Sequence, residues 1–239
     1  DLKGNEWLVK DTGAGGAGFG AQWDPNFVHP VRTAVITNDD AFRDMESVKN
    51  ALNFRYNGDA FKRVVYTESH DEVANGKARV PEEIWPGDSH NWFAKKRSTL
   101  GAVLVFTAPG IPMLFQGQEF LEDKWFTDTE PLDWGQAKEM EGIIYLYRDL
   151  MRLRRNADGV SKGLTGQQIH VYHVNQNDKV IAFHRWSNGG PGDSVVVVMN
   201  MTNKTLTDYT IGFPAAGLWS LRFDSHAAAY SPDYEGQVS

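Results

Sequence analysis

Residues 64–72 of this chain read VVYTESHDE, and this segment decides the fold. It begins as an apolar β-strand and ends with three carboxylates and one imidazole within five residues. Burying such groups costs several kcal/mol each unless each gains a partner or a substrate. In α/β barrels the ends of the strands and the loops after them hold the chemistry. The segment therefore predicts an α/β architecture with a site where this strand ends, centred on His70 and Asp71.

Composition and charge exclude several classes of protein. The 239 residues hold 24 Lys and Arg against 31 Asp and Glu, a net charge of −7, and contain no basic run of five or more residues. That balance argues against nucleic acid and anionic membranes as main partners. No apolar run approaches the roughly 18 residues that indicate a membrane-spanning helix. The absence of cysteine excludes disulfides, thiolate catalysis and cysteine-ligated zinc. We expect a bacterial-type cytoplasmic protein.

The first part of the chain alternates strand and helix. Its first residue is Asp1 rather than Met, so we expect a piece of a longer protein. The glycine-rich residues 1–30 predict a long loop with one short strand. After them we expect a helix over 41–54 capped by Asn38 or Asp39, a strand over 64–67, a helix from Ser89 to Pro109-Gly110, a strand over 111–116 and a helix over 141–155.

The pattern changes near Asp158-Gly159. From there short segments with alternating apolar and polar residues predict antiparallel strands over 169–174, 180–186, 195–201, 209–213 and 218–223. We therefore expect parallel βαβ units in residues 1–158 and an all-β module in residues 159–239. Three strand–helix repeats cannot close an eight-stranded barrel, so the first half of such a barrel would be missing from this chain.

Several segments together resemble the α-amylase superfamily. The run YTESHDEV at 66–73 is similar to the signature that follows the seventh barrel strand of that superfamily, and the extension ANGK at 74–77 resembles its 1,4-α-glucan branching enzymes. Further similarity lies in AGGAGFGAQWD (14–24), GIPMLFQGQEF (110–120), YLYRDLMRLRRN (145–156) and the stretch 200–214. The resemblance implies the last three βα units of a (β/α)₈ TIM barrel, followed by a C-terminal β-sandwich that is possibly incomplete.

The resemblance also implies an activity. Branching enzymes cleave an α-1,4 linkage of a glucan with retention and pass the cleaved chain to a 6-hydroxyl, and they need no metal or organic cofactor. By this resemblance His70 and Asp71 hydrogen-bond the hydroxyls of the sugar ring that is attacked. Such contacts tighten in the oxocarbenium-like transition state. The nucleophile and the general acid would precede Asp1, so we expect the chain alone to be inactive.

Other residues are candidates for contact with an α-glucan, each with a plainer alternative. Glu68 and Glu72 flank His70 and Asp71 and would support the site or touch the substrate. Glu119 would line the same rim, or pair with an Arg or Lys. Trp23 and four further loop tryptophans would stack on sugar rings, or pack in the core. His70 and Asp71 could themselves be a solvated strand end.

Two alternative functions remain open at this stage. An α-amylase-type hydrolase of the same superfamily shares every residue that this chain offers, because transfer and hydrolysis differ only in the acceptor. A non-catalytic glucan-binding fragment is the other alternative. The pattern G-x-G-x-x-G at residues 13–18 lacks a preceding strand and a following helix, so it does not indicate dinucleotide binding.

Overall fold

The computed structural model describes residues 4–236, and its first part is built on a small parallel sheet. The strands are β1 (Gln22–Trp23), β2 (Arg63–Val65) and β3 (Ile111–Pro112), in the order β1-β2-β3. Both pairs of neighbours are parallel, with Trp23 opposite Val64 and Val65 opposite Pro112. The predicted strands over 64–67 and 111–116 are therefore confirmed in place, and both are shorter than predicted.

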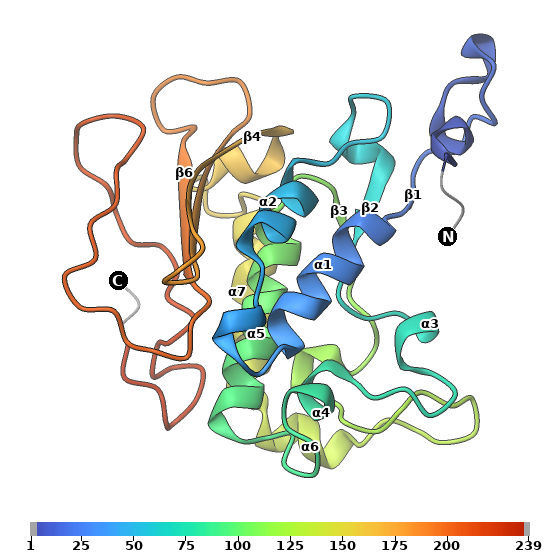
Figure 1. Ribbon diagram of the computed structural model, residues 1–239, viewed down its shortest axis with the longest axis vertical. Coiled ribbons are helices and arrows are strands. Elements are labelled where there is room, and N and C mark those ends of the chain that lie inside the picture. The colour runs from blue at the N-terminus through green and yellow to red at the C-terminus, as the bar shows by residue number, and fades with distance from the viewer. Residues whose placement is uncertain (1–3, 237–239) are drawn as a thin grey trace.

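Helices connect the strands of this sheet (Figure 1). Between β1 and β2 the chain forms α1 (Pro25–Ile36) and α2 (Met45–Asn53), and between β2 and β3 it forms α3 (His70–Val73), α4 (Val80–Ile84) and α5 (Trp92–Thr107). After β3 come α6 (Trp134–Glu139) and α7 (Glu141–Arg154). Short 3-10 turns lie at 6–9, 12–14, 40–42, 60–62, 118–120 and 162–165.

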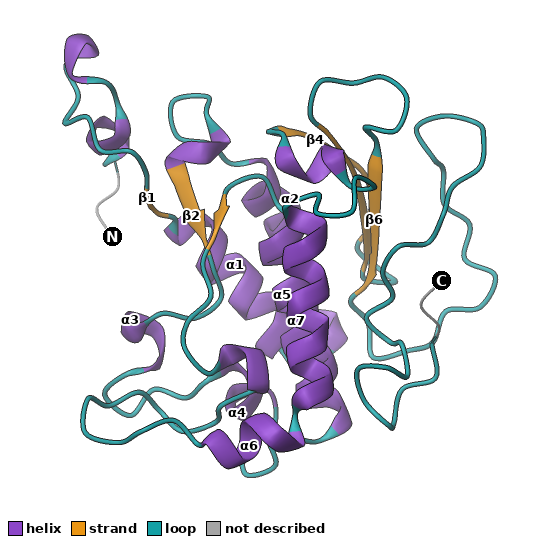
Figure 2. Cartoon of the chain, turned by 180° about the vertical axis from the view of Figure 1, so that it is seen from behind, coloured by secondary structure: helices purple, strands orange, loops and turns teal. Residues whose placement is uncertain are grey.

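The second part is an antiparallel sheet in the order β4-β5-β6. Its strands are β4 (Gln168–Asn175), β5 (Val180–Trp186) and β6 (Val195–Asn200). The central strand β5 is the most buried, and the predicted hairpin of β4 and β5 is confirmed. Helices α5 and α7 lie between the two sheets in both views (Figures 1 and 2). The core is continuous, because buried residues of the helices and of β5 belong to one cluster.

Side-chain caps set where α1, α2, α5 and α6 begin. The carboxylate of Asp24 accepts a hydrogen bond from the backbone N–H of Asn26 and starts α1, with Pro25 in its first turn. Asp44 starts α2 in the same way, so the helix expected over 41–54 begins only at Met45. Asn91, not Ser89, caps α5. The sequence prediction missed α1, because the first residues of this helix fall in the stretch 1–30, which shows no clear helical period and predicts a loop.

The strands expected over 209–213 and 218–223 are wrong. The structure forms no strand after β6 within residues 201–236. Pro214 and Gly217 interrupt this stretch, and Gly217 has a φ of 138°. Leu218 and Leu221 are exposed, so no buried face fixes a register here. Alternating residues alone do not make a strand without a neighbour to pair with.

Buried arginines join the two parts of the chain. Arg43 donates from Nε to the Ala34 carbonyl at 2.8 Å and from Nη1 to the carbonyl of Met201, just after β6. Arg185, on β5, donates to the carbonyl of Thr107 at the end of α5. Both arginines are at most 1% exposed. These bonds fix the antiparallel sheet against the helices.

Candidate functional site

The candidate site lies at the carboxyl edge of the parallel sheet. Trp23 ends β1, the segment 66–71 follows β2, and the turn 118–120 follows β3. Because the strands are parallel, all three segments leave the sheet at the same edge. Figure 1 shows α3, which carries His70 and Asp71, standing at this edge beyond the ends of the strands.

Three rings from two strand ends form the centre of the site. The ring centroid of Trp23 lies 5.5 Å from that of Tyr66 and 5.5 Å from that of His70, in edge-to-face contact. Trp23 is 39% exposed, whereas Tyr66 is buried beneath it. Burial, followed by the nearby charges of Glu72 and Asp71, raises the pKa of the Tyr66 hydroxyl. Tyr66 therefore keeps its proton and remains a hydrogen-bond donor.

His70 and Asp71 are open to a ligand. The distance between His70 Nε2 and Asp71 Oδ1 is 3.2 Å, and their side chains are 55% and 69% exposed. The ammonium group of Lys77 donates to the backbone carbonyl of Asp71 at 2.7 Å. The site thus presents an imidazole donor, a carboxylate acceptor and the free face of Trp23 together. Such a set suits a polyhydroxyl ligand with an apolar ring face.

Glu68 does not share this exposure. Its Oε2 pairs with Arg79 Nη1 at 3.0 Å, and its Oε1 accepts the backbone N–H of Val80 at 2.7 Å. The side chain of Glu68 is 1% exposed. Of the two roles expected for Glu68, this burial favours the supporting one, because both carboxylate oxygens are already bonded within the fold.

Glu72 and Glu119 have different surroundings. Glu72 is half-buried on α3, where its charge acts on Tyr66. Glu119 lies in the turn after β3, and its Oε2 is enclosed with no hydrogen-bond partner among residues 4–236. No Arg or Lys of that range forms an ion pair with it. Burial, and then the charges of Glu68 and Glu119, hold the pKa of the Tyr147 hydroxyl well above its usual value.

The remaining loop tryptophans are exposed. Trp85 at the end of α4, Trp92 at the start of α5, Trp125 and Trp134 are between 39% and 68% exposed. Trp85 stacks on Phe93, with ring centroids 5.9 Å apart and an interplanar angle of 8°. These four rings are not buried in a core. Each keeps exposed surface on which a ligand could stack.

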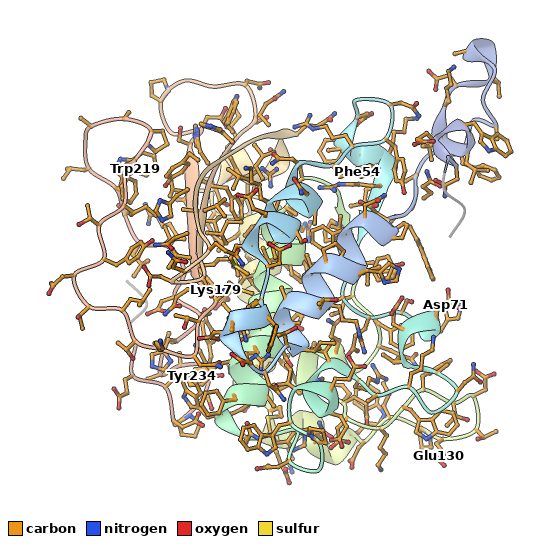
Figure 3. All side chains as sticks on the ribbon, in the orientation of Figure 1. Phe54, Asp71, Glu130, Lys179, Trp219 and Tyr234 are labelled. Carbon is orange, nitrogen blue, oxygen red and sulfur yellow. The ribbon has the colours of Figure 1, made fainter. Side chains whose placement is uncertain are left out.

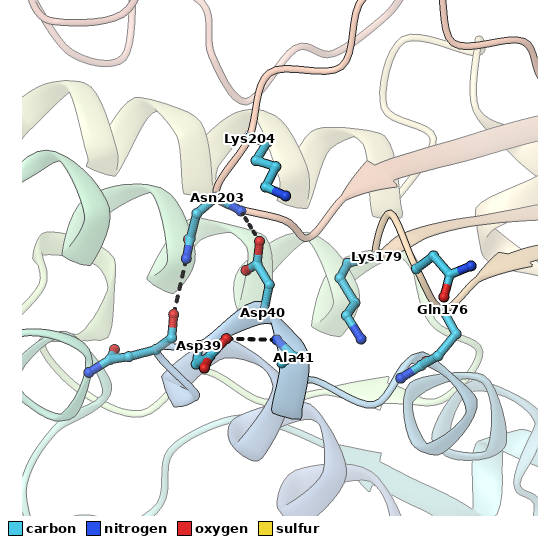
Figure 4. A pocket seen from close by; sticks show the side chains of 9 residues that line it. Asp39, Asp40, Ala41, Gln176, Lys179, Asn203 and Lys204 are labelled. Atoms are coloured by element: carbon cyan, nitrogen blue, oxygen red, sulfur yellow. Dashed lines mark hydrogen bonds between the residues drawn. The ribbon is translucent and has the colours of Figure 1, made fainter.

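A pocket of about 670 Å³ lies elsewhere in the molecule. Its wall joins residues 38–41 to residues around Lys179 and Asn203, at the contact between the two parts of the chain (Figure 4). Asp40 is held by Arg43 and by the backbone N–H of Asn203, so its polar groups already have partners. Figure 3 shows Lys179 left of the middle of the molecule and Asp71 well apart from it, near the right-hand edge. This pocket therefore belongs to the contact between the helical part of the chain and the antiparallel sheet, which we call the junction, and not to the candidate site.

Among the described residues no group of three or more His, Asp or Glu is placed to hold a metal ion. No helix within 4–236 is long and apolar enough to cross a membrane.

Sequence reasoning missed three residues of the site. Tyr66 supports Trp23, Lys77 holds the backbone of Asp71, and Arg79 pairs with Glu68. Tyr66 and Lys77 lie within the segments YTESHDEV and ANGK quoted above, and Lys77 and Arg79 close the polar stretch that begins at Glu68. Charges of opposite sign at the two ends of a loop are a weak signal, because most such charges are solvated.

Comparison with known proteins shows what this chain is similar to. Residues 170–238 match the family described as "Alpha amylase, C-terminal all-beta domain". The chain is 31% identical over 229 residues to the "1,4-alpha-glucan branching enzyme GlgB" of Pseudomonas syringae pv. tomato, covering 94% of this chain and 30% of that protein. The protein of the same name from Aromatoleum aromaticum is 30% identical over 230 residues, with 94% and 35% covered. The chain thus spans about a third of the length of these relatives.

Solved structures with a similar fold are pullulanases. The apo pullulanase of Paenibacillus barengoltzii matches with a TM-score of 0.61 and 19% identity, over 85% of this chain and 34% of that chain. The pullulanase of Anoxybacillus sp. LM18-11 complexed with maltotetraose matches with a TM-score of 0.58 and 21% identity, over 77% and 29%. At these identities the likeness shows the fold alone. This chain is therefore similar to about a third of the length of glucan branching enzymes, its residues 170–238 match the α-amylase C-terminal all-β domain, and it shares a fold with pullulanases.

Proposed function

We propose that this chain is part of a 1,4-α-glucan branching enzyme. The observation that carries the proposal is the open pair of His70 and Asp71 beside Trp23, at the carboxyl edge of a parallel sheet. The alignment with branching enzymes over 94% of the chain supports it. The substrate would be an α-1,4-glucan such as amylose or glycogen, and the product would carry a new α-1,6 branch.

The exposed groups suit the transition state of glycosyl transfer. As the glycosidic bond breaks, the sugar becomes oxocarbenium-like, and hydrogen bonds to its hydroxyls strengthen. His70 would donate to one hydroxyl, and Asp71 would accept from one or two. Trp23 would stack on the apolar face of a neighbouring ring. These contacts together supply several kcal/mol of stabilisation to the transition state.

A retaining mechanism also needs a nucleophilic carboxylate and a carboxylic acid about 5 Å apart. Glu68 is excluded as a nucleophile by its ion pair with Arg79. Asp71 is paired with His70 and carries the hydroxyl contact. The proposal therefore assigns the nucleophile and the acid to residues outside this chain, and it predicts that the 239 residues alone do not cleave glucan.

The same proposal assigns the parallel strands to a barrel. In this interpretation β1, β2 and β3 are the last three strands of a (β/α)₈ barrel, and the sheet β4-β5-β6 belongs to the C-terminal all-β domain. Support comes from the sequential order of the parallel strands, the helices between them and the fold shared with pullulanases.

The test uses the protein purified from its native gene. We expect it to lower the iodine absorbance of amylose and to create α-1,6 linkages, measured by chain release with a debranching enzyme, without a rise in reducing ends. A rise in reducing ends without new branches would instead identify a hydrolase. Absence of both changes, with amylose still bound, would identify a non-catalytic glucan-binding protein.

A further inference from the structure

The loop that carries His70 and Asp71 is closed at its base by one buried ion pair. Glu68 precedes the loop and Arg79 ends it, and their side chains are each 1% exposed. The distance between Arg79 Nη1 and Glu68 Oε2 is 3.0 Å. The second carboxylate oxygen accepts the backbone N–H of Val80 at 2.7 Å, so the two ends of the loop are joined twice.

Arg79 also reaches the segments that follow β3. Its Nη1 donates to the carbonyl of Gln116 at 2.9 Å, and its Nε donates to the carbonyl of Lys124 at 3.1 Å. The guanidinium lies 5.0 Å from the centroid of the Phe115 ring. One planar side chain therefore connects the loop after β2 with two points after β3. Only arginine offers this fork of donors.

The loop also has anchors beyond its base. Lys77 holds the carbonyl of Asp71, Arg32 donates to the carbonyl of Ala78 at 2.7 Å, and the carbonyl of Val73 accepts the backbone N–H of Phe126 at 2.7 Å. The side chain of Val73 is fully buried, whereas His70 and Asp71 are mostly exposed. The positions of His70 and Asp71 relative to Trp23 therefore depend on the base of the loop together with these anchors.

Arg79 is not itself a contact for a sugar. The cavity beside it has a volume of about 20 Å³, enough for a single water at most. A buried ion pair is also weak evidence for stability, because apolar residues of similar volume often serve as well. The ion pair of Glu68 and Arg79 is better explained by the way it fixes the two ends of the loop together.

We propose that Arg79 is a positioning residue that holds His70 and Asp71 against the end of β3 through Glu68 and Gln116. This inference rests on the proposed function, because the residues that Arg79 positions are those that would contact the sugar during glycosyl transfer. Loss of the fork would leave the fold intact, and it would let the loop between Glu68 and Arg79 move away from the ring of Trp23.

The test compares two conservative variants in the protein from its native gene. Arg79→Lys keeps the charge and cannot span three acceptors at once. Arg43→Lys is the matched control, because Arg43 is equally buried and also donates to several carbonyls, at the junction. We expect amide exchange in the peptide 69–78 to accelerate about tenfold in Arg79→Lys, and kcat to fall about 100-fold. The control should change neither.

A second variant guards against simple unfolding. The double change Glu68→Gln and Arg79→Gln removes both charges, while the amide at position 68 can still accept the Val80 N–H and the amide at position 79 can still donate to one carbonyl, so the melting temperature should stay near that of the parent. We expect the same fast exchange and the same loss of kcat. Unchanged kcat and exchange in Arg79→Lys, or losses that only match those of Arg43→Lys, would overturn the proposal. If the parent protein does not act on glucan, the proposed function fails. Amide exchange in the peptide 69–78, compared between Arg79→Lys and Arg43→Lys, then still tests whether Arg79 positions the loop.

Discussion

Trp23 and His70 meet edge to face across two neighbouring strand ends, with their ring centroids 5.5 Å apart. This contact joins the residue that would stack on one sugar to the residue that would hydrogen-bond the next. Because His70 is otherwise exposed, the indole edge limits how its imidazole can turn. The two rings therefore act as one surface, and each should influence the contacts of the other.

Replacing Trp23 with Ala should weaken substrate binding. Aromatic contacts contribute about 0.5–1.5 kcal/mol beyond burial, so KM for amylose should rise by about 2- to 10-fold. Trp219→Ala is the control, because Trp219 is similarly exposed, at 37%, in the stretch after β6. The measurement is initial branching rate against amylose concentration. An equal rise of KM in both variants would refute a specific role for Trp23.

Replacing Asp71 with Asn should remove a contact that matters most in the transition state. We expect kcat/KM to fall about 100-fold, as when one preorganised group is lost from an oxyanion site. The melting temperature should change little, because the side chain is 69% exposed. Asp128→Asn, an exposed carboxylate in the loop before α6, is the control. Retention of more than a third of the activity by Asp71→Asn would contradict the role of this residue.

Trp85 offers a test of chain length. Its ring stacks on Phe93 at the surface, beyond α4 and apart from His70 in the chain. Trp85→Ala should therefore raise KM for amylose about 3-fold, as expected from one aromatic contact, while the affinity for maltoheptaose stays unchanged. Phe42→Ala, at 78% exposure, serves as the control. Equal effects on both substrates would mean that Trp85 acts only by packing.

Asp40 should control stability in acid. Burial alone would raise its pKa, but hydrogen bonds from Arg43 and Thr202 lower the pKa below the usual value of 3.8. A carboxylate with a lowered folded pKa contributes stability above its unfolded pKa and loses it as the pH falls through the folded pKa. Asp40→Asn should therefore melt at a lower temperature than the parent at pH 7.

The same comparison is then repeated along a pH series. The difference in melting temperature between Asp40→Asn and the parent should shrink below about pH 4, since protonation removes the charge from the parent too. Asp39→Asn is the neighbouring control. A constant difference from pH 7 to pH 2.5 would show that the charge of Asp40 is not what stabilises the junction.

Local patterns predicted the elements that depend on local causes. The apolar run that ends at Glu68 located β2 and the exposed pair after it, because a burial pattern and a sudden change to charge are both visible in sequence. The hairpin of β4 and β5 followed from its alternation and short turn. The stretch 209–223 shows the opposite case, since its alternation has no partner strand and forms none.

Long-range partners could not be predicted in this way. The role of Glu68 depends on Arg79 and on the carbonyl of Gln116, which lies 37 residues further along the chain from Arg79. A sequence pattern does not indicate whether a carboxylate at a strand end turns outward to a ligand or inward to a cation. The strand before the candidate site could therefore be predicted from the sequence, while the division between exposed and supporting carboxylates depends on these long-range contacts.

The buried arginines of the junction have a consequence for protein engineering. Arg43 and Arg185 each donate to backbone carbonyls on the other side of the contact between helices and antiparallel sheet. A chimera that exchanges the sheet between related enzymes would keep these hydrogen bonds only if each arginine and the backbone segment that it faces came from the same parent. A crossover at Asp158-Gly159 divides these pairs, so it would leave a guanidinium facing a foreign backbone. Crossover sites for swapping this sheet should therefore be chosen by preserved arginine–carbonyl pairs and not by the apparent domain boundary.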